Sequence, residues 1–195
     1  MKLVLATKNS GKVVEFRRIL AEFGAANLEV VGLDEYPEIG DIEETGKTFE
    51  ENSLLKARTI CKLTGLPALA DDSGICVDAL NGAPGLYSAR YSGNGDAANN
   101  EKLLAELKEV PDENRGAYFI CVAAYVRPDG YEKVEEGRFY GKIMHQVKGS
   151  GGFGYDPLFQ PEGLNCSSAE LSAEEKDAIS HRGKAMRAIA PYIIG

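Results

Sequence analysis

Apolar residues at the start of the chain follow first a strand pattern and then a helix pattern. The β-rich run KLVLAT (2–7) predicts a strand. Residues 12–23 then carry apolar side chains at helical spacing, which predicts a helix that Gly24 closes. The chain is therefore expected to open with a strand, a loop and a helix.

The next apolar stretches predict a second helix and two strands. Thr48 and Glu51 have the spacing of a capping box, so a helix is predicted to begin there and to stop near Gly65. The segment 66–80 reads as two strands, LPALAD and GICVDAL. A turn formed by Asp-Asp-Ser-Gly is expected between them.

The second half predicts a helix followed by a hairpin. Asp96 is expected to cap a helix that ends before Pro111. Residues 117–126 are apolar on both faces, which places this strand in the centre of the sheet. A turn at 128–130 is predicted to connect it to a more polar partner strand at 131–143.

The last third is predicted to be helical. Ser172 and Glu175 form another capping-box pattern, and Ser180 is a candidate cap for a final helix. The chain shows no internal repeat and no linker long enough to separate domains. Strands that alternate with helices therefore predict one α/β domain over residues 1–195.

Composition and charge narrow the class of protein. With 195 residues, 44% of them hydrophobic and 27% charged, the chain resembles an ordinary globular enzyme. Its net charge of −8 repels a polyanion, so no nucleic acid polymer is expected as a partner. Met1 leads directly into KLVLAT without a signal-peptide pattern, and no apolar run approaches ~18 residues. We expect a cytoplasmic protein with no membrane contact, whose four cysteines are reduced and mostly buried.

Two nucleotide-binding patterns fail on their context. Gly46-Lys47-Thr48 ends like a phosphate-binding P-loop, but Asp41 stands where that motif requires glycine. The glycines within 149–154 fit GxGxxG, yet Pro157 follows at once and stops the helix that a dinucleotide site requires.

The loop between the first strand and the first helix is a candidate anion site. Backbone N–H groups at a helix N-terminus favour an anion, and this loop adds a hydroxyl, an amide and an ammonium group. An ordinary helix cap with solvated lysines would have the same sequence. The six residues of the loop are Thr7, Lys8, Asn9, Ser10, Gly11 and Lys12.

Two acidic clusters flank the helix that begins at Thr48. Lys56 lies on one face of that helix together with Asn52. The loop before the helix supplies Glu43 and Glu44, and the segment after it supplies Asp71 and Asp72. These carboxylates could converge on Mg²⁺, which takes one or two protein carboxylates, or they could cap helices and face solvent.

The third candidate is the glycine loop GGFGYD with the basic residues near the C-terminus. Phe153 offers an aromatic platform, Gly154 allows close approach of the backbone, and Asp156 offers a carboxylate beside Tyr155. A turn-rich connection with a core phenylalanine is the alternative. Lys176, His181 and Arg182 are donors suited to a carbonyl or a phosphate, or exposed bases of a helix.

Taken together, these segments resemble the inosine triphosphate pyrophosphatase family over nearly the whole chain. The resemblance is carried by TKNSGK, ETGKTFEENSLLKA, LADDSG, GAPGLYSARYSG, GGFGYDPLF and SHRGKA, in that order. It implies a homodimeric enzyme that hydrolyses dITP, ITP or XTP to the monophosphate and pyrophosphate with Mg²⁺. The implied fold is an elongated mixed sheet flanked by helices, in two lobes with the active site in the cleft between them.

The resemblance also implies roles for individual residues. Asp72 would be the general base and a metal ligand, with Glu44 as a second ligand that Glu43 or Glu38 could replace. Asp71 would be a further metal ligand or a hydrogen-bond anchor. Lys12 and Lys56 would be catalytic or contact phosphate, and Ser73 would contact the substrate. The implied purine pocket consists of Phe153, Gly154, Tyr155, Asp156, Lys176, His181 and Arg182.

Other functions remain open at this point. One is a pyrophosphatase of similar fold that acts on modified pyrimidine nucleoside triphosphates. Another is a nucleotide-binding regulator without catalysis, which the adjacent pair Asp71 and Asp72 argues against. A structural or RNA-binding module is disfavoured by the net charge of −8.

Overall fold

The computed structural model describes residues 1–23 and 28–195, and the chain forms two compact units. Unit 1 comprises Met1–Asp72, Cys121–Gly137 and Arg182–Gly195. Unit 2 comprises Ser73–Ile120 and Arg138–His181. The chain passes from one unit to the other four times, three of them within a strand.

Within the described residues, the strands form one mixed sheet in the order β2-β1-β3-β4-β5-β6. Strand β1 is parallel to β2 and to β3, whereas β5 and β6 are antiparallel. This confirms the mixed α/β class and the central place of β4 next to its hairpin partner β5. The strands are β1 Lys2–Leu5, β2 Glu29–Val31, β3 Ala68–Val77, β4 Gly116–Val126, β5 Glu132–Ile143 and β6 Phe159–Pro161.

Three of the described α-helices, α1, α2 and α4, begin at a residue whose side chain caps the helix. Asn9 caps α1 by accepting from the Lys12 N–H at 3.1 Å. Thr48 likewise caps α2 by accepting from the Glu51 N–H, and both halves of the Ser172 capping box are present at α4. The helices are α1 Ser10–Ala21, α2 Phe49–Thr64, α3 Asp96–Glu106, α4 Ala173–Ile179 and α5 His181–Ile194.

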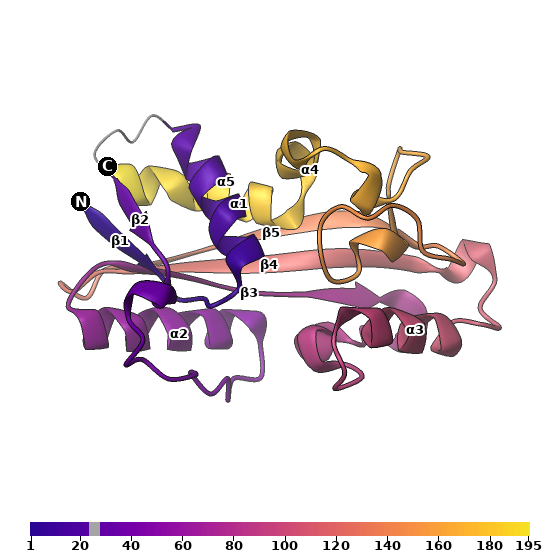
Figure 1. The fold of residues 1–195 in the computed structure, drawn as a ribbon, viewed down its shortest axis with the longest axis horizontal. Coiled ribbons are helices and arrows are strands. Elements are labelled where there is room, and N and C mark those ends of the chain that lie inside the picture. Colours follow the sequence, from indigo (N-terminus) through magenta and orange to yellow (C-terminus); the bar gives the residue numbers. More distant parts are fainter. Residues whose placement is uncertain (24–27) are drawn as a thin grey trace. The chain divides into compact units, whose positions relative to one another are not determined.

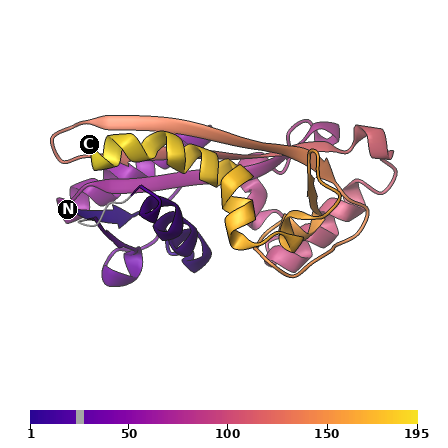
Figure 2. The same ribbon diagram turned by 90° about the horizontal axis from the view of Figure 1, so that it is seen from above.

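The strands of unit 1 bury both of their faces, against different helices. Alternate residues such as Leu3, Leu5 and Leu69 pack with the apolar sides of α1 and α5. The residues between them, among them Val4 and Ala70, pack with α2. Figure 1 shows α1 and α5 over one face of these strands and α2 over the other, and Figure 2 looks onto the face that α1 and α5 cover. This period-2 separation later decides which side chains meet.

The core of unit 2 lies between the sheet and α3. Phe159 of β6 makes tilted or edge contacts with Phe119 and Phe139, at centroid separations of 4.7 and 5.1 Å. Ile75 of β3 and Leu103 of α3 are completely buried in the same cluster. The core thus fixes the end of β3 and the second half of α3 beside the 3₁₀ turn at Asp156–Leu158.

Three local expectations differ from the structure or lie outside it. The turn predicted at Asp-Asp-Ser-Gly is wrong, because β3 runs without interruption through all four residues. Asp96 does not cap α3: Gly95 occupies the cap position and the Asp96 carboxylate accepts from the Gly154 N–H at 2.8 Å. Helix α1 ends at Ala21, and the predicted cap Gly24 lies outside the described residues. The short strands β2 and β6 were not predicted.

Among the described helices, none has the length and apolar character needed to cross a membrane. The four cysteines are free thiols, and Cys61, Cys76 and Cys121 are buried. This agrees with the expectation of reduced, mostly buried thiols.

Arg115 is a buried cation that holds unit 2 together through backbone carbonyls. Its side chain is 1% exposed and donates to the carbonyls of Ile143 at 2.7 Å, Leu107 at 2.6 Å and Met144 at 2.9 Å. Burial lowers the pKa of this guanidinium, and Asp112 partly opposes that effect. The residue ties the end of α3 to the end of β5.

We expect Arg115→Met to destabilise the protein by about 3 kcal/mol, because three buried carbonyls lose their donor. Chemical denaturation followed by far-UV circular dichroism measures this. The matched control is Arg127→Met at the exposed β4–β5 turn, which should leave the midpoint unchanged. Equal midpoints for both variants would contradict the structural role of Arg115.

Candidate active site

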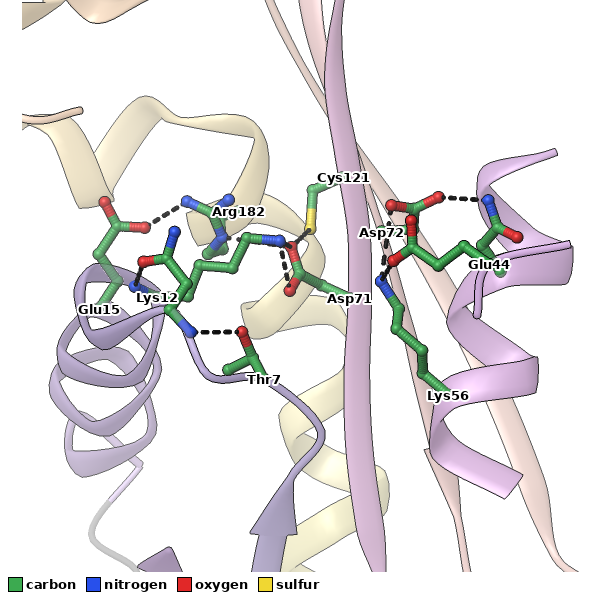
Figure 3. A network of polar contacts seen from close by, with 11 residues as sticks. Thr7, Lys12, Glu15, Glu44, Lys56, Asp71, Asp72, Cys121 and Arg182 are labelled. Carbon is green, nitrogen blue, oxygen red and sulfur yellow. Dashed lines mark hydrogen bonds and ion pairs between the residues drawn. The ribbon is translucent and has the colours of Figure 1, made fainter. Parts of the chain in front are cut away.

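Strand β3 sends two adjacent carboxylates to opposite faces of unit 1. Asp71 lies on the face of Leu69, toward α1 and α5, and Asp72 lies on the face of Ala70, toward α2. Figure 3 shows the two side chains leaving β3 in opposite directions, each toward its own partners. Both residues are buried, with exposed fractions of 2% and 8%.

The Asp71 carboxylate is surrounded by cations. Lys12 donates to its two oxygens at 3.0 and 2.9 Å, and the Arg182 Nε lies 3.5 Å from Oδ2. The Cys121 thiol lies 3.9 Å from the same oxygen. Burial alone would raise the pKa of Asp71, but Lys12, Arg182 and Lys56 hold it well below its usual range. The carboxylate is therefore firmly ionised.

Arg182 belongs to this same network of unit 1. Its guanidinium pairs with Glu15 of α1 as well as with Asp71, and 2% of the residue is exposed. Burial would lower its pKa, but the two carboxylates raise it. The chain Glu15, Arg182, Asp71 and Lys12 links α1, α5 and β3 (Figure 3).

Asp72 faces a different set of partners. Asn52 of α2 donates to Oδ2 at 3.0 Å, and the Lys56 Nζ lies 3.6 Å from Oδ1. The same ammonium donates to Glu44 at 2.6 Å. Asn52 also accepts from the Gly46 N–H at 2.8 Å, which ties the acidic loop to the start of α2.

The electrostatics of Asp72 differ from those of Asp71. Burial raises its pKa, Lys56 opposes this, and the nearby Glu44 raises it further. Lys56 shows the reverse balance: burial would lower its pKa, but Asp72, Asp71 and Glu44 raise it. The Asp72 and Glu44 carboxylates thus share the Lys56 ammonium. Among these three groups two negative charges face one positive charge, which favours a further cation on this face.

A divalent cation fits the donor set of Asp72 and Glu44. Among residues 1–23 and 28–195, no group of three or more His, Cys, Asp or Glu side chains could hold a metal ion. A closed, all-protein metal site is therefore not formed by these residues. Mg²⁺ requires less, because it is commonly held by one or two carboxylates and keeps its water and phosphate ligands.

The loop of residues 7–12 is ordered by its own side chains. The Asn9 N–H donates to the Thr7 hydroxyl at 3.1 Å, and Asn9 in turn caps α1. Lys8 points outward to the exposed Asp41, at 2.8 Å. Ser10 is exposed and Gly11 half-buried at the first turn of α1. The loop therefore presents a helix N-terminus, as expected for an anion site.

In unit 2, Asp156 holds the glycine loop. Its Oδ2 accepts from the Phe153 N–H at 2.9 Å and from Lys176 at 2.6 Å, while Oδ1 accepts from the Ser168 hydroxyl at 3.0 Å. Gly152 adopts φ 69°, and a Cβ there would lie 2.1 Å from Oδ2. Asp156, the carboxylate expected to contact a purine, therefore accepts from three groups of the protein and fixes the glycine loop.

Helix α3 clamps the next residue of the loop. Asp96 accepts from the Gly154 N–H at 2.8 Å, and Asn100 donates to the Gly154 carbonyl at 3.0 Å. Both polar backbone groups of Gly154 are thus held by side chains one helical turn apart. Tyr155 is buried in the core and donates to the Ser88 carbonyl at 2.8 Å.

Three further residues expected to bind substrate, Lys176, His181 and Ser73, each have different neighbours. The Lys176 ammonium lies 5.0 Å from the centroid of the half-buried Phe153 ring. His181 stacks on Phe119 with centroids 4.9 Å apart. Ser73 is half-buried in β3. Unit 2 thus brings Phe153, Gly154, Asp156 and Lys176 together, whereas Arg182 lies with Asp71 in unit 1.

Sequence reasoning missed several partners of the expected residues. Glu15 follows Lys12 by one helical turn, so its spacing placed it on the same side of α1. Asn100 and Ser168 carried no sequence signal, because each meets its partner only through the fold of unit 2.

Comparison with known proteins places this geometry in a family. A family model described as the Ham1 family matches residues 3–192. The dITP/XTP pyrophosphatase of Streptomyces coelicolor is 56% identical over 194 residues, which cover 98% of this chain and 96% of that protein.

Solved structures show the same similarity. A crystal structure titled as a nucleoside-triphosphatase / dITP/XTP pyrophosphatase from Mycobacterium abscessus is 49% identical, with a TM-score of 0.78 and coverage of 98% of this chain and 100% of that one. The structure of a HAM1 protein from Coxiella burnetii is 40% identical, with a TM-score of 0.88 and coverage of 99% and 98%.

We expect Asp156→Ala to destabilise the protein by about 3 kcal/mol, because the buried Lys176 loses its counter-charge and two further donors lose their acceptor. Urea unfolding measures the change. The control is Asp41→Ala, which removes an exposed aspartate that is also paired with a lysine. The control should unfold at the parent midpoint, and an equally stable Asp156→Ala would refute the structural role.

Proposed function

The chain belongs to the Ham1 family, and from that premise we propose that it hydrolyses non-canonical purine nucleoside triphosphates to the monophosphate and pyrophosphate. The substrates proposed are dITP, ITP and XTP. Such an enzyme removes damaged nucleotides from the precursor pool.

The observation that supports the proposal best is the arrangement around Asp72. A buried carboxylate with a raised pKa lies beside a lysine and a second carboxylate. On the other face of β3, Lys12 stands at the first turn of α1 after the loop 7–12. A triphosphate needs both cations and a base near its α-phosphorus, and unit 1 supplies these groups.

We assign Mg²⁺ to Asp72 and Glu44. When bound, the ion would offset the charge of the triphosphate and draw electron density from the phosphorus that is attacked. Glu43 and Glu38 were alternatives for Glu44, but it is Glu44 that pairs with Lys56 at 2.6 Å. This contact supports Glu44 as the second ligand.

The chain's own groups account for the remaining chemistry. Asp72 orients the attacking water and takes its proton. Asn52 fixes the carboxylate by donating to Oδ2, which leaves Oδ1 toward Lys56. Lys56 and Lys12 contact phosphate oxygens, and the loop 7–12 binds phosphate through its N–H groups.

Base recognition is assigned to unit 2. Phe153 stacks on the purine, and Lys176 contacts the edge or face of the purine ring. His181 donates to the 6-carbonyl of hypoxanthine or xanthine. Adenine carries a donor at that position, so a site built from donors rejects it. Tyr155 and Asp156 act by holding the loop, Ser73 contacts substrate, and Arg182 acts from within unit 1.

Two further features belong to the proposal: a cytoplasmic location and a homodimeric state. The two competing functions make different predictions. A pyrimidine pyrophosphatase would turn over dUTP or methylated UTP faster than dITP. A regulator would bind nucleotide without Mg²⁺-dependent hydrolysis.

We expect pyrophosphate release from dITP and XTP with Mg²⁺, and little from ATP or dUTP. Chelation of the metal by EDTA should abolish turnover, and added Mg²⁺ should restore it. A nucleotide panel assayed for pyrophosphate tests this. Faster turnover of a pyrimidine substrate, or turnover that survives EDTA, would overturn the proposed reaction.

We expect Asp72→Asn to lower kcat for dITP about 10³-fold, because it removes both the base and one metal ligand. The fold should remain intact, since a raised pKa means that the folded protein already disfavours the charged carboxylate. Steady-state kinetics and a thermal melt check both statements. The control Asp129→Asn, at the exposed β4–β5 turn, should keep parental kinetics; activity of Asp72→Asn within a few-fold of the parent would reject the role of Asp72.

A further inference from the structure

Asp71 and Asp72 are neighbours in sequence, but β3 separates their chemistry. Successive side chains of a strand point to opposite faces, and here the two faces are covered by different helices. A metal held by Asp72 and Glu44 lies on the α2 face. Asp71 points away from it, toward Lys12, Cys121 and Arg182 (Figure 3).

The oxygens of Asp71 are already occupied by cations of the chain. Both accept from the single ammonium of Lys12, at 3.0 and 2.9 Å, and Oδ2 also lies 3.5 Å from the Arg182 Nε. None of the side chain of Asp71 is exposed, against 17% of that of Lys12. The Lys12 side chain thus retains some access to solvent, whereas the Asp71 side chain that holds its ammonium has none.

The charges of this network balance. Two cations, Lys12 and Arg182, face two anions, Asp71 and Glu15, all of them buried or half-buried. Buried charges are tolerated only when they are paired in this way, and loss of one partner leaves its counter-charge exposed to a low dielectric. Asp71 is the member that touches both cations.

Lys12 is held at two points, one through its backbone and one through its ammonium. Its backbone N–H donates to the Asn9 side chain at 3.1 Å, and its ammonium returns to Asp71 on the neighbouring strand. A lysine side chain is flexible, and its immobilisation costs conformational entropy. Pairing with Asp71 meets this cost before any anion arrives at the loop 7–12.

We propose that Asp71 is a positioning residue for the triphosphate: it holds the Lys12 ammonium beside β3 and the Arg182 guanidinium of α5, and it ligates no metal. This rests on the proposed function of unit 1 as the triphosphate site. Asp71 then acts on substrate binding through Lys12, whereas Asp72 acts on the metal and the water. The pair performs two separable tasks.

The test compares Asp71→Asn with Glu44→Gln in two titrations, of dITP at saturating Mg²⁺ and of Mg²⁺ at saturating dITP. Asp71→Asn should raise the KM for dITP about tenfold, lower kcat less than threefold, and leave the Mg²⁺ concentration for half-maximal rate within twofold of the parent. Glu44→Gln should instead raise the Mg²⁺ requirement. A Mg²⁺ requirement raised tenfold by Asp71→Asn would make it a ligand and overturn the proposal.

A double-mutant cycle shows whether Asp71 acts through Lys12. The variants are Asp71→Asn, Lys12→Met and the two combined. If Asp71 positions Lys12, Asp71→Asn should add less than twofold to the KM once Lys12 is replaced. Multiplicative effects of the two substitutions would overturn the proposal, as would a KM for Asp71→Asn within twofold of the parent.

Stability is controlled within the same set. Asp71→Asn alone leaves two buried cations facing one carboxylate, whereas the combined variant removes one charge of each sign. Thermal melts identify variants that fail to fold. If Asp71→Asn does not fold, the comparison of the combined variant with Lys12→Met still decides, because the proposal requires their KM values to agree within twofold.

Calorimetric binding of inorganic triphosphate separates this inference from the proposed reaction. The parent should bind it in the presence of Mg²⁺, and Asp71→Asn should bind about tenfold more weakly at an unchanged Mg²⁺ requirement. If the parent hydrolyses none of the panel nucleotides but binds inorganic triphosphate about tenfold more tightly than Asp71→Asn, the proposed reaction is wrong and the positioning role is supported. Equal binding by parent and variant would overturn the positioning role.

Discussion

The alternation of side chains along β3 is the constraint on which unit 1 depends. Two adjacent ionised carboxylates in one strand would repel each other if they faced the same surface, and burial would make that repulsion costly. The pleat directs Asp71 and Asp72 to opposite faces, so each can meet cations of its own. Each face must therefore be covered by a helix that places a positively charged side chain near the carboxylate.

The surrounding helices follow from this requirement. Helices α1 and α5 bring Lys12 and Arg182 to one face, and α2 brings Asn52 and Lys56 to the other. Apolar layers beneath these polar groups hold the helices in place, with Leu69 in one layer and Ala70 in the other. Polar chemistry and core packing thus use the same period of two, and neither could shift register without the other.

The elements that were predicted correctly are those whose signal is local. The side chains of the capping residues Thr48 and Ser172 accept from backbone N–H groups three residues away. The turn at Asp-Asp-Ser-Gly was predicted from the same kind of local preference and is wrong. Those residues favour turns when they are solvated, but here Lys12 and Lys56 neutralise the aspartates and allow the strand to continue. Strands of three residues, such as β2 and β6, are too short for any period to appear.

The sequence nominated candidate residues for the site but not the contacts that they make. Its motifs resemble a known family closely enough to nominate Asp71 and Asp72 together, yet no sequence pattern joins Lys12 to a carboxylate 59 positions away. No sequence pattern indicated that the Asp156 oxygens accept hydrogen bonds from Phe153, Ser168 and Lys176. Such pairings come from the tertiary fold, which decides which polar groups are desolvated together.

Local pairing also explains how a protein with a net charge of −8 can accommodate a highly charged anion. At physiological ionic strength the Debye length is about 8 Å, so acidic residues scattered over the surface are largely screened from a buried site. A triphosphate meets the local set of cationic side chains, of which Lys12 is held by Asp71 of β3 and Lys56 lies between two carboxylates. Because these carboxylates already compensate the lysines, little net positive charge remains there, and a divalent cation is the natural source of the missing charge. The local charge balance of unit 1, and not the net charge of the chain, therefore favours a divalent cation beside the triphosphate.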